Sequence, residues 1–271
     1  MRGFLHIYEA FESNYVQPRR VDVWVPPGHA CDRNQRFPVL YMHDGQNLFN
    51  PQTSTIGVAW NIDTAVARLV DAGTIPEMIV VGAWSTSLRW PEYMIPGPFD
   101  AAENGAQLRA AFEAERGSPP IGDAYLRFIV EELKPFIDAR YRTKPDRAHT
   151  FVMGSSMGGL ISLAALCTYP EVFGGAGCLS THWVAAEGIM VDYLPEILPE
   201  PDAHRIYFDY GTETLDAQYP PFQARVDAHM RAAGYTEGED WITRKFEGAE
   251  HSERAWRKRV HIPLTFLLGD L

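Results

Sequence analysis

The sequence has few cysteines, no long apolar run and no leader-like start. Its 271 residues include three cysteines, Cys31, Cys167 and Cys178. An odd number without close spacing predicts neither a disulfide framework nor a zinc site. No window approaches the roughly 18 to 20 apolar residues of a membrane span, and no small-residue cleavage site marks a signal peptide. We therefore expect a soluble protein of the reducing cytoplasm.

Positive charge is also scarce. The chain has 24 Lys and Arg against 35 Asp and Glu, for a net charge of -11. Because an acidic chain repels phosphate backbones and anionic lipid, nucleic acid and membranes are not expected partners. One basic cluster near the C-terminus is predicted to be a solvated helix face: Arg254, Arg257, Lys258 and Arg259. No pattern indicates an oligomeric state.

Metal-ligand spacing is missing as well. The histidines never form a pattern such as H-E-x-x-H, which argues against a metallohydrolase. No metal and no organic cofactor are expected.

What the sequence does contain is an alternation of strand-like and helix-like segments. Residues 3–10 and Arg19–Val25 are predicted as strands before the alternation begins. The later predicted strands are Phe37–His43, Glu77–Ala83, His149–Met153, Gly175–Leu179, Arg205–Tyr210 and Trp241–Phe246. The predicted helices are Asn61–Ala72, Asp123–Ala139, Met157–Thr168, Phe222–Ala233 and a last one through Glu253–Arg259 that can break before Pro263. This order predicts an α/β fold in one domain over residues 1–271: a mostly parallel central sheet, antiparallel N-terminal strands, and helices on both faces.

Residues 84–121 interrupt this alternation. A long insertion between a strand and the next helix is usually a functional loop or lid, so we expect it to cover a site. The substrate-binding candidates lie here and after a later strand: Trp84, Arg89, Trp90, Tyr93, His182 and Trp183.

The strongest local signal is Gly154-Ser155-Ser156-Met157-Gly158. It matches the G-x-S-x-G nucleophile elbow, and it stands between a predicted strand and a predicted helix, as that motif requires. The elbow holds its serine on a strained turn at the carboxyl edge of the sheet. Ser156 is therefore the predicted nucleophile, and Ser155 is out of frame.

A serine hydroxyl is a weak nucleophile and needs a base. In this fold the chain order is serine, acid, histidine, and five histidines follow the serine: His182, His204, His229, His251 and His261. His251 is preferred because it lies in a small-residue loop after the last predicted strand. His229 and His261 fall on predicted helices, His204 is at the wrong edge of the sheet, and His182 can line the pocket.

The acid is expected in the loop after the strand Arg205–Tyr210. That loop offers two carboxylates, Glu213 and Asp216. Asp216 is preferred because the Gly-Thr turn needs a few residues before the chain can point a carboxylate back at the histidine. Glu213 stays open as the alternative, whereas Asp209 lies inside the strand.

An elbow also requires an oxyanion hole. One donor should be the backbone N–H of Met157, directly after the serine. The second should come from His43-Asp44-Gly45-Gln46-Asn47, where Gly45 allows close approach and Gln46 presents its N–H. His43 and Asp44 are expected to brace this loop.

Together these motifs resemble the "putative esterase" family of α/β-hydrolases. That family includes esterase D, enterochelin-esterase-like enzymes, feruloyl esterase modules and mycolyltransferase antigens. The resemblance rests on the loop at His43–Asn47, on Gly154–Gly159 and on Glu250-His251 ahead of a helix with Trp256. It implies an α/β-hydrolase fold and an acyl-serine mechanism.

The expected function is a serine esterase that acts on a small-molecule ester without a cofactor. Carried over from the family, the roles fall on Ser156, His251 and the amides of Gln46 and Met157. Two alternatives remain: an acyltransferase to a sugar or other alcohol, and a hydrolase-like binding module without activity.

Overall fold

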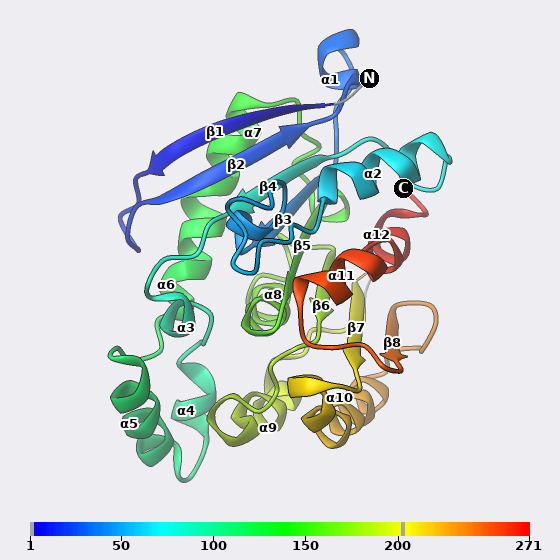
Figure 1. Ribbon diagram of the computed structural model, residues 1–271. Helices are drawn as coiled ribbons and strands as arrows, with labels where there is room; N and C mark the ends of the chain where they lie inside the picture. The colour runs from blue at the N-terminus through cyan, green and yellow to red at the C-terminus, as the bar shows by residue number, and fades with distance from the viewer. Residues whose placement is uncertain (1–2, 202–203) are drawn as a thin grey trace.

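The computed structural model describes residues 3–201 and 204–271, built around one eight-stranded sheet. The strand order is β1-β2-β4-β3-β5-β6-β7-β8 (Figure 1). The strands are β1 (Phe4–Phe11), β2 (Arg19–Val25), β3 (Val39–His43), β4 (Ile79–Ala83), β5 (Thr150–Ser155), β6 (Gly175–Leu179), β7 (Arg205–Gly211) and β8 (Trp241–Phe246). The pairs β1–β2 and β2–β4 are antiparallel, and all later pairs are parallel. The predicted fold class is confirmed.

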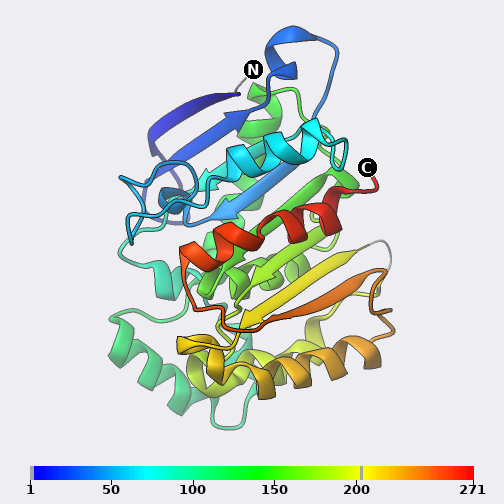
Figure 2. The same cartoon turned by 45° about the vertical axis from the view of Figure 1, so that its right-hand side comes forward.

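Helices cover both faces of this sheet. They are α1 (Gly28–Cys31), α2 (Ile62–Asp71), α3 (Arg89–Glu92), α4 (Gly97–Ala101), α5 (Gly105–Arg116), α6 (Gly122–Arg127), α7 (Lys134–Arg140), α8 (Met157–Thr168), α9 (Ile189–Ile197), α10 (Pro220–Ala232), α11 (Glu253–Arg259) and α12 (His261–Leu268). Figure 2 shows α2 in cyan and α11 and α12 in red in front of one face. Within residues 3–201 and 204–271, none of these helices has both the length and the apolar character needed to cross a bilayer.

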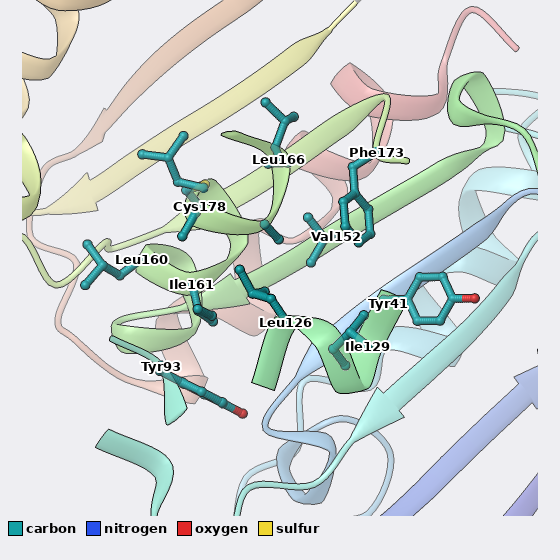
Figure 3. Close-up of a cluster of buried hydrophobic side chains, with 14 of the residues drawn as sticks. Tyr41, Tyr93, Leu126, Ile129, Val152, Leu160, Ile161, Leu166, Phe173 and Cys178 are labelled. Carbon is teal, nitrogen blue, oxygen red and sulfur yellow. The ribbon is translucent and has the colours of Figure 1, made fainter. Parts of the chain in front are cut away.

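The strand side chains alternate between two cores, as expected for strands buried on both faces. On β3, Leu40 and Met42 face α2 and α12, whereas Val39 and Tyr41 face the side of α8. Helix α8 is apolar all round and buried from Met157 to Cys167, which is typical of a helix enclosed by a core. Figure 3 shows its side chains packed beside those of α6 and the central strands.

One predicted helix differs in detail, and one helix of the structure was not predicted. The predicted Asp123–Ala139 helix is divided by a π-helical turn between α6 and α7. Pro135 lies next to this turn and cannot donate an interior helical hydrogen bond, which accounts for the wider turn. Helix α9 was not predicted at all.

The insertion at residues 84–121 is a folded unit of three short helices, α3, α4 and α5. Figure 1 shows α4 and α5 on the side of α9, against which α4 packs, whereas α3 lies next to α6. A buried ion pair joins α3 to β2: Arg19 Nη2 lies 2.6 Å from Glu92 Oε1, and the two side chains are 1% and 0% exposed. The insertion is therefore tied to the sheet at its first helix.

Candidate active site

Ser156 occupies the turn between β5 and α8. Its backbone has φ 58° and ψ -124°, a strained conformation for a residue with a side chain. Hydrogen bonds hold it from both sides. The Ser156 N–H donates to the Leu179 carbonyl at 2.9 Å, and the His182 N–H donates to the Ser156 carbonyl at 3.1 Å. Ser156 is half-buried, and its backbone conformation is fixed by hydrogen bonds to β6 and to the segment that follows β6.

His251 and Asp216 form a direct side-chain contact. Nδ1 of His251 lies 2.5 Å from Oδ1 of Asp216. The loop between β8 and α11 is fixed where the His251 N–H donates to Thr214 Oγ1 at 2.9 Å, and the imidazole meets the Trp256 ring edge-on with centroids 4.9 Å apart. Glu213, the alternative acid, is exposed.

The Asp216 carboxylate is fully buried but well supplied with donors. Oδ2 accepts the Gly211 N–H at 2.6 Å and the Ser180 hydroxyl at 2.6 Å. Burial opposes its ionisation, but the bonds from His251, Ser180 and Gly211 outweigh burial and hold the pKa of Asp216 below its usual value. An ionised Asp216 fixes the Nδ1–H tautomer of His251 and leaves Nε2 free to accept a proton.

The loop after β3 lies against the start of α8. A Cβ placed on Gly158 would be 3.4 Å from His43 Cβ and 3.5 Å from Asp44 Oδ2. Met157 is the first residue of α8, so its N–H has no acceptor within the helix. Gln46 lies in a single 3-10 turn, Gly45–Asn47. Among residues 3–201 and 204–271, no acceptor contacts the N–H of Met157 or Gln46, so neighbouring segments present two backbone donors.

Side chains brace the Gln46 loop. Gln46 Nε2 donates to Ser85 Oγ at 2.7 Å, and the Ser85 N–H donates back to Gln46 Oε1 at 3.2 Å. Asp44 has the left-handed φ of 56° and accepts two bonds from Arg89, both of 2.7 Å. Burial opposes the Asp44 charge, but the Arg89 cation outweighs it and lowers the pKa of Asp44.

A cavity of about 350 Å³ lies between α5 and the segment after β6. Its lining residues are Trp90, Leu108, Ala111, Phe112, Glu115, Arg116, His182, Val184, Ala185, Ala186 and Glu187. Trp90 meets the His182 ring edge-on at 5.2 Å, and the Arg116 guanidinium lies 3.6 Å from the Trp90 centroid. Because His182 also bonds the Ser156 carbonyl, this α5 cavity adjoins the elbow.

Two of the six substrate-binding candidates line the α5 cavity, Trp90 and His182. Arg89 instead holds Asp44. The other three do not line the cavity: Tyr93 and Trp183 are each 1% exposed, and Trp84 donates its indole N–H to Asp22 at 3.0 Å.

Sequence reasoning missed several residues around His251 and Asp216. Tyr219 bonds His182 Nδ1 at 2.9 Å and packs edge-on against His251. Arg259 was predicted on a solvated face but is 4% exposed and pairs with Asp209. This prediction was wrong because the charge pattern of α11 does not reveal a buried acidic partner on β7.

The chain is similar in sequence to known proteins. The chain is 26% identical over 260 residues to YbbA, an uncharacterized protein of Bacillus subtilis (strain 168), covering 93% of each. It is 27% identical over 158 residues to the ferri-bacillibactin esterase BesA of the same organism, covering 54% of this chain and 49% of that protein.

Solved structures share the fold. A ferulic acid esterase superposes with a TM-score of 0.72 at 18% identity, over 99% of both chains. The enterobactin esterase FES of Shigella flexneri, in the presence of 2,3-di-hydroxy-N-benzoyl-glycine, gives a TM-score of 0.65 at 18% identity, over 98% of this chain and 59% of that one. A family model described as "Putative esterase" matches residues 13–262. Because that match spans most of the chain, the protein belongs to this esterase family.

Proposed function

We propose that the protein is a serine esterase that hydrolyses a small-molecule carboxylic ester through an acyl-serine intermediate. The observation that carries the proposal is the 2.5 Å contact of His251 Nδ1 with Asp216, together with the strained elbow that presents Ser156. A histidine oriented by a carboxylate and a serine at such an elbow are the parts of an acyl-transfer site.

The proposed reaction has two halves. His251 Nε2 takes the Ser156 proton as Oγ attacks the ester carbonyl, and the amides of Gln46 and Met157 donate to the oxyanion. The C–O bond to the alcohol then breaks, and His251 protonates the leaving alcohol. Water repeats the sequence on the acyl-serine and releases the acid.

We also propose an aromatic acyl group as the part of the substrate that enters the α5 cavity. Trp90, Phe112 and His182 line that cavity, and proteins similar in sequence to this chain include an endo-1,4-beta-xylanase/feruloyl esterase and a ferri-bacillibactin esterase. The insertion then acts as a lid within a single hydrolase domain. A cytoplasmic location rests on the free thiols of Cys31, Cys167 and Cys178.

The test is covalent labelling. A fluorophosphonate probe should label the wild-type protein and the Ser155→Ala variant, but not Ser156→Ala. The same proteins are assayed for acid release from acetyl, butyryl and feruloyl esters, with and without an added alcohol. A wild-type protein that neither labels nor releases acid contradicts the proposal, and acyl transfer to the alcohol in preference to water replaces the esterase with an acyltransferase.

A further inference from the structure

Ser180 has an unusual backbone directly after β6. Its φ is 41° although it is not a glycine, and the side chain is fully buried. Its N–H donates to Asp209 twice, to the carbonyl at 2.9 Å and to Oδ1 at 3.0 Å. A strained residue held this firmly is more typical of a functional site than of a plain turn.

The Ser180 hydroxyl has partners for all of its hydrogen-bonding capacity. Trp256 Nε1–H donates to Oγ at 2.9 Å, and Arg259 Nη2–H donates to it at 2.8 Å. Neither group can accept a bond, and a serine hydroxyl has one proton and two acceptor sites. The proton of Ser180 is therefore directed to Asp216 Oδ2, 2.6 Å away.

The two carboxylate oxygens of Asp216 have different hydrogen-bond partners. Oδ2 receives the Ser180 hydroxyl and the Gly211 N–H. Oδ1 is left to face His251 Nδ1. Rotation of the carboxylate would break both bonds to Oδ2, so its plane is fixed relative to the imidazole.

The donors to Ser180 are themselves held in place. Arg259 makes two bonds to Asp209, with Nε 3.0 Å from Oδ2 and Nη2 2.8 Å from Oδ1, and Tyr207 donates its hydroxyl to the same carboxylate at 2.9 Å. Arg259 Nη2 also lies 4.0 Å from Asp216 Oδ2. Trp256, on the same helix α11, packs against His251.

We propose that Ser180 is a positioning residue, whose hydroxyl, locked by Trp256 and Arg259, orients the Asp216 carboxylate toward His251. This inference rests on the proposed function. Removal of the hydroxyl leaves Asp216 Oδ2 with a single hydrogen-bond donor, the Gly211 N–H, and frees the carboxylate to rotate. We therefore expect the loss of the Ser180 hydroxyl to lower turnover more than it lowers the stability of the fold.

The test compares Ser180→Ala and Ser180→Gly with a matched control. Glycine tolerates positive φ, so the second variant deletes the hydroxyl while it relieves the backbone. Thr143→Val is the control, because Thr143 is a buried hydroxyl that donates to a different carboxylate, Asp138, at 2.7 Å. Loss of a hydrogen bond to a charged group predicts roughly a ten- to hundred-fold lower kcat, with KM nearly unchanged.

The pH dependence separates positioning from folding. A carboxylate that can rotate away from His251 stabilises the protonated ring less. The acid limb of kcat/KM should therefore move to lower pH in both Ser180 variants, and the low-field proton resonance of the His251–Asp216 bond should shift. Thr143→Val should leave both readouts unchanged.

A folded Ser180 variant with wild-type kcat and an unmoved acid limb overturns the inference and leaves the esterase intact. A wild-type protein without esterase activity defeats the proposed function instead, before any variant is compared. Should Ser180→Ala fail to fold, Ser180→Gly and the resonance of its imidazole proton decide the outcome.

Discussion

Gly154 and Gly158 approach each other so closely that a Cβ on Gly154 would lie 2.7 Å from the carbonyl carbon and oxygen of Gly158. The Gly158 Cα is also only 2.9 Å away, and all three of these atoms belong to the backbone and cannot rotate aside. The close crossing of β5 and α8 at the elbow therefore requires glycine at position 154, because a residue with a Cβ would not fit.

Gly154→Ala should destabilise the protein by about 3 kcal/mol, toward the upper end of the usual overpacking cost. Urea unfolding measures the loss. Gly158→Ala is the matched comparison, since its Cβ would meet nothing nearer than 3.4 Å. Equal midpoints for the two variants would show that the backbone contact at Gly154 is not limiting.

Substitution of the two candidate acids should give opposite results. Asp216→Asn should lower kcat by roughly four orders of magnitude, as loss of the orienting carboxylate does in other triad enzymes. Glu213→Gln should remain near wild type because Glu213 is exposed and its side chain does not bond His251. Steady-state kinetics on one ester measures both. The reverse ranking would assign the acid to Glu213.

Two buried histidines should make the protein acid-sensitive. Burial lowers the pKa of His43 to about 3, and burial together with the His251 charge lowers the pKa of His182 to about 4. Their unfolded values are near 6.5, so the unfolded chain binds more protons between these limits. Stability should fall as the pH drops below about 6.5, by up to about 1.4 kcal/mol per pH unit for each histidine.

Urea unfolding between pH 6.5 and 5.0 tests this dependence. His182→Gln should give a shallower slope against pH than wild type, because one of the two groups is gone. The variant also loses the bond to Tyr219, so its stability at neutral pH should be lower. The slope, rather than the absolute value, is the measured quantity, and parallel curves would contradict the prediction.

The Arg19–Glu92 pair should behave as a buried charge pair. Arg19→Met leaves Glu92 buried without its cation and should cost about 3–5 kcal/mol. The double variant Arg19→Met/Glu92→Met should recover more than half of that loss. A double-mutant cycle by urea unfolding measures the coupling, and independent, additive losses would mean that the ion pair does not anchor the insertion.

Trp90 should contribute to substrate affinity. Trp90→Ala removes the ring that lies between Arg116 and His182. Because the aromatic acyl group would lose its contact with this ring, we expect KM for a feruloyl ester to rise roughly two- to tenfold. An acetyl ester should be less affected. Tyr15→Ala serves as control, because Tyr15 stacks on Arg127 at 4.1 Å, outside the cavity. A similar rise in KM for both variants would place substrate elsewhere.

The sequence predicted those parts of the site that depend on chain order. A strand, an elbow and a helix follow one another locally, so the strained turn at Ser156 could be located from its motif. The loops that hold Asp216 and His251 could be found because parallel strands end at one edge of the sheet.

The supporting residues could not be found in this way. Ser180 and Arg259 meet across 79 positions of the chain, and nothing local in either segment indicates the partner. Trp84 was predicted to bind substrate because it is aromatic, but its indole N–H bonds Asp22, which is 62 positions away in the chain. Nothing near Trp84 in the sequence indicates this partner. Helix α9 carries Pro195 in its interior, which hides its helical pattern.

The order of these parts along the chain has a consequence for biosynthesis. The elbow is complete by Gly158, but the proposed base and the two donors to Ser180 lie between His251 and Arg259. A nascent chain that has folded its central strands therefore still holds an inert serine. Hydrolytic competence should arise only after α11 has been synthesised and docked, and fragments released earlier should be inactive toward esters.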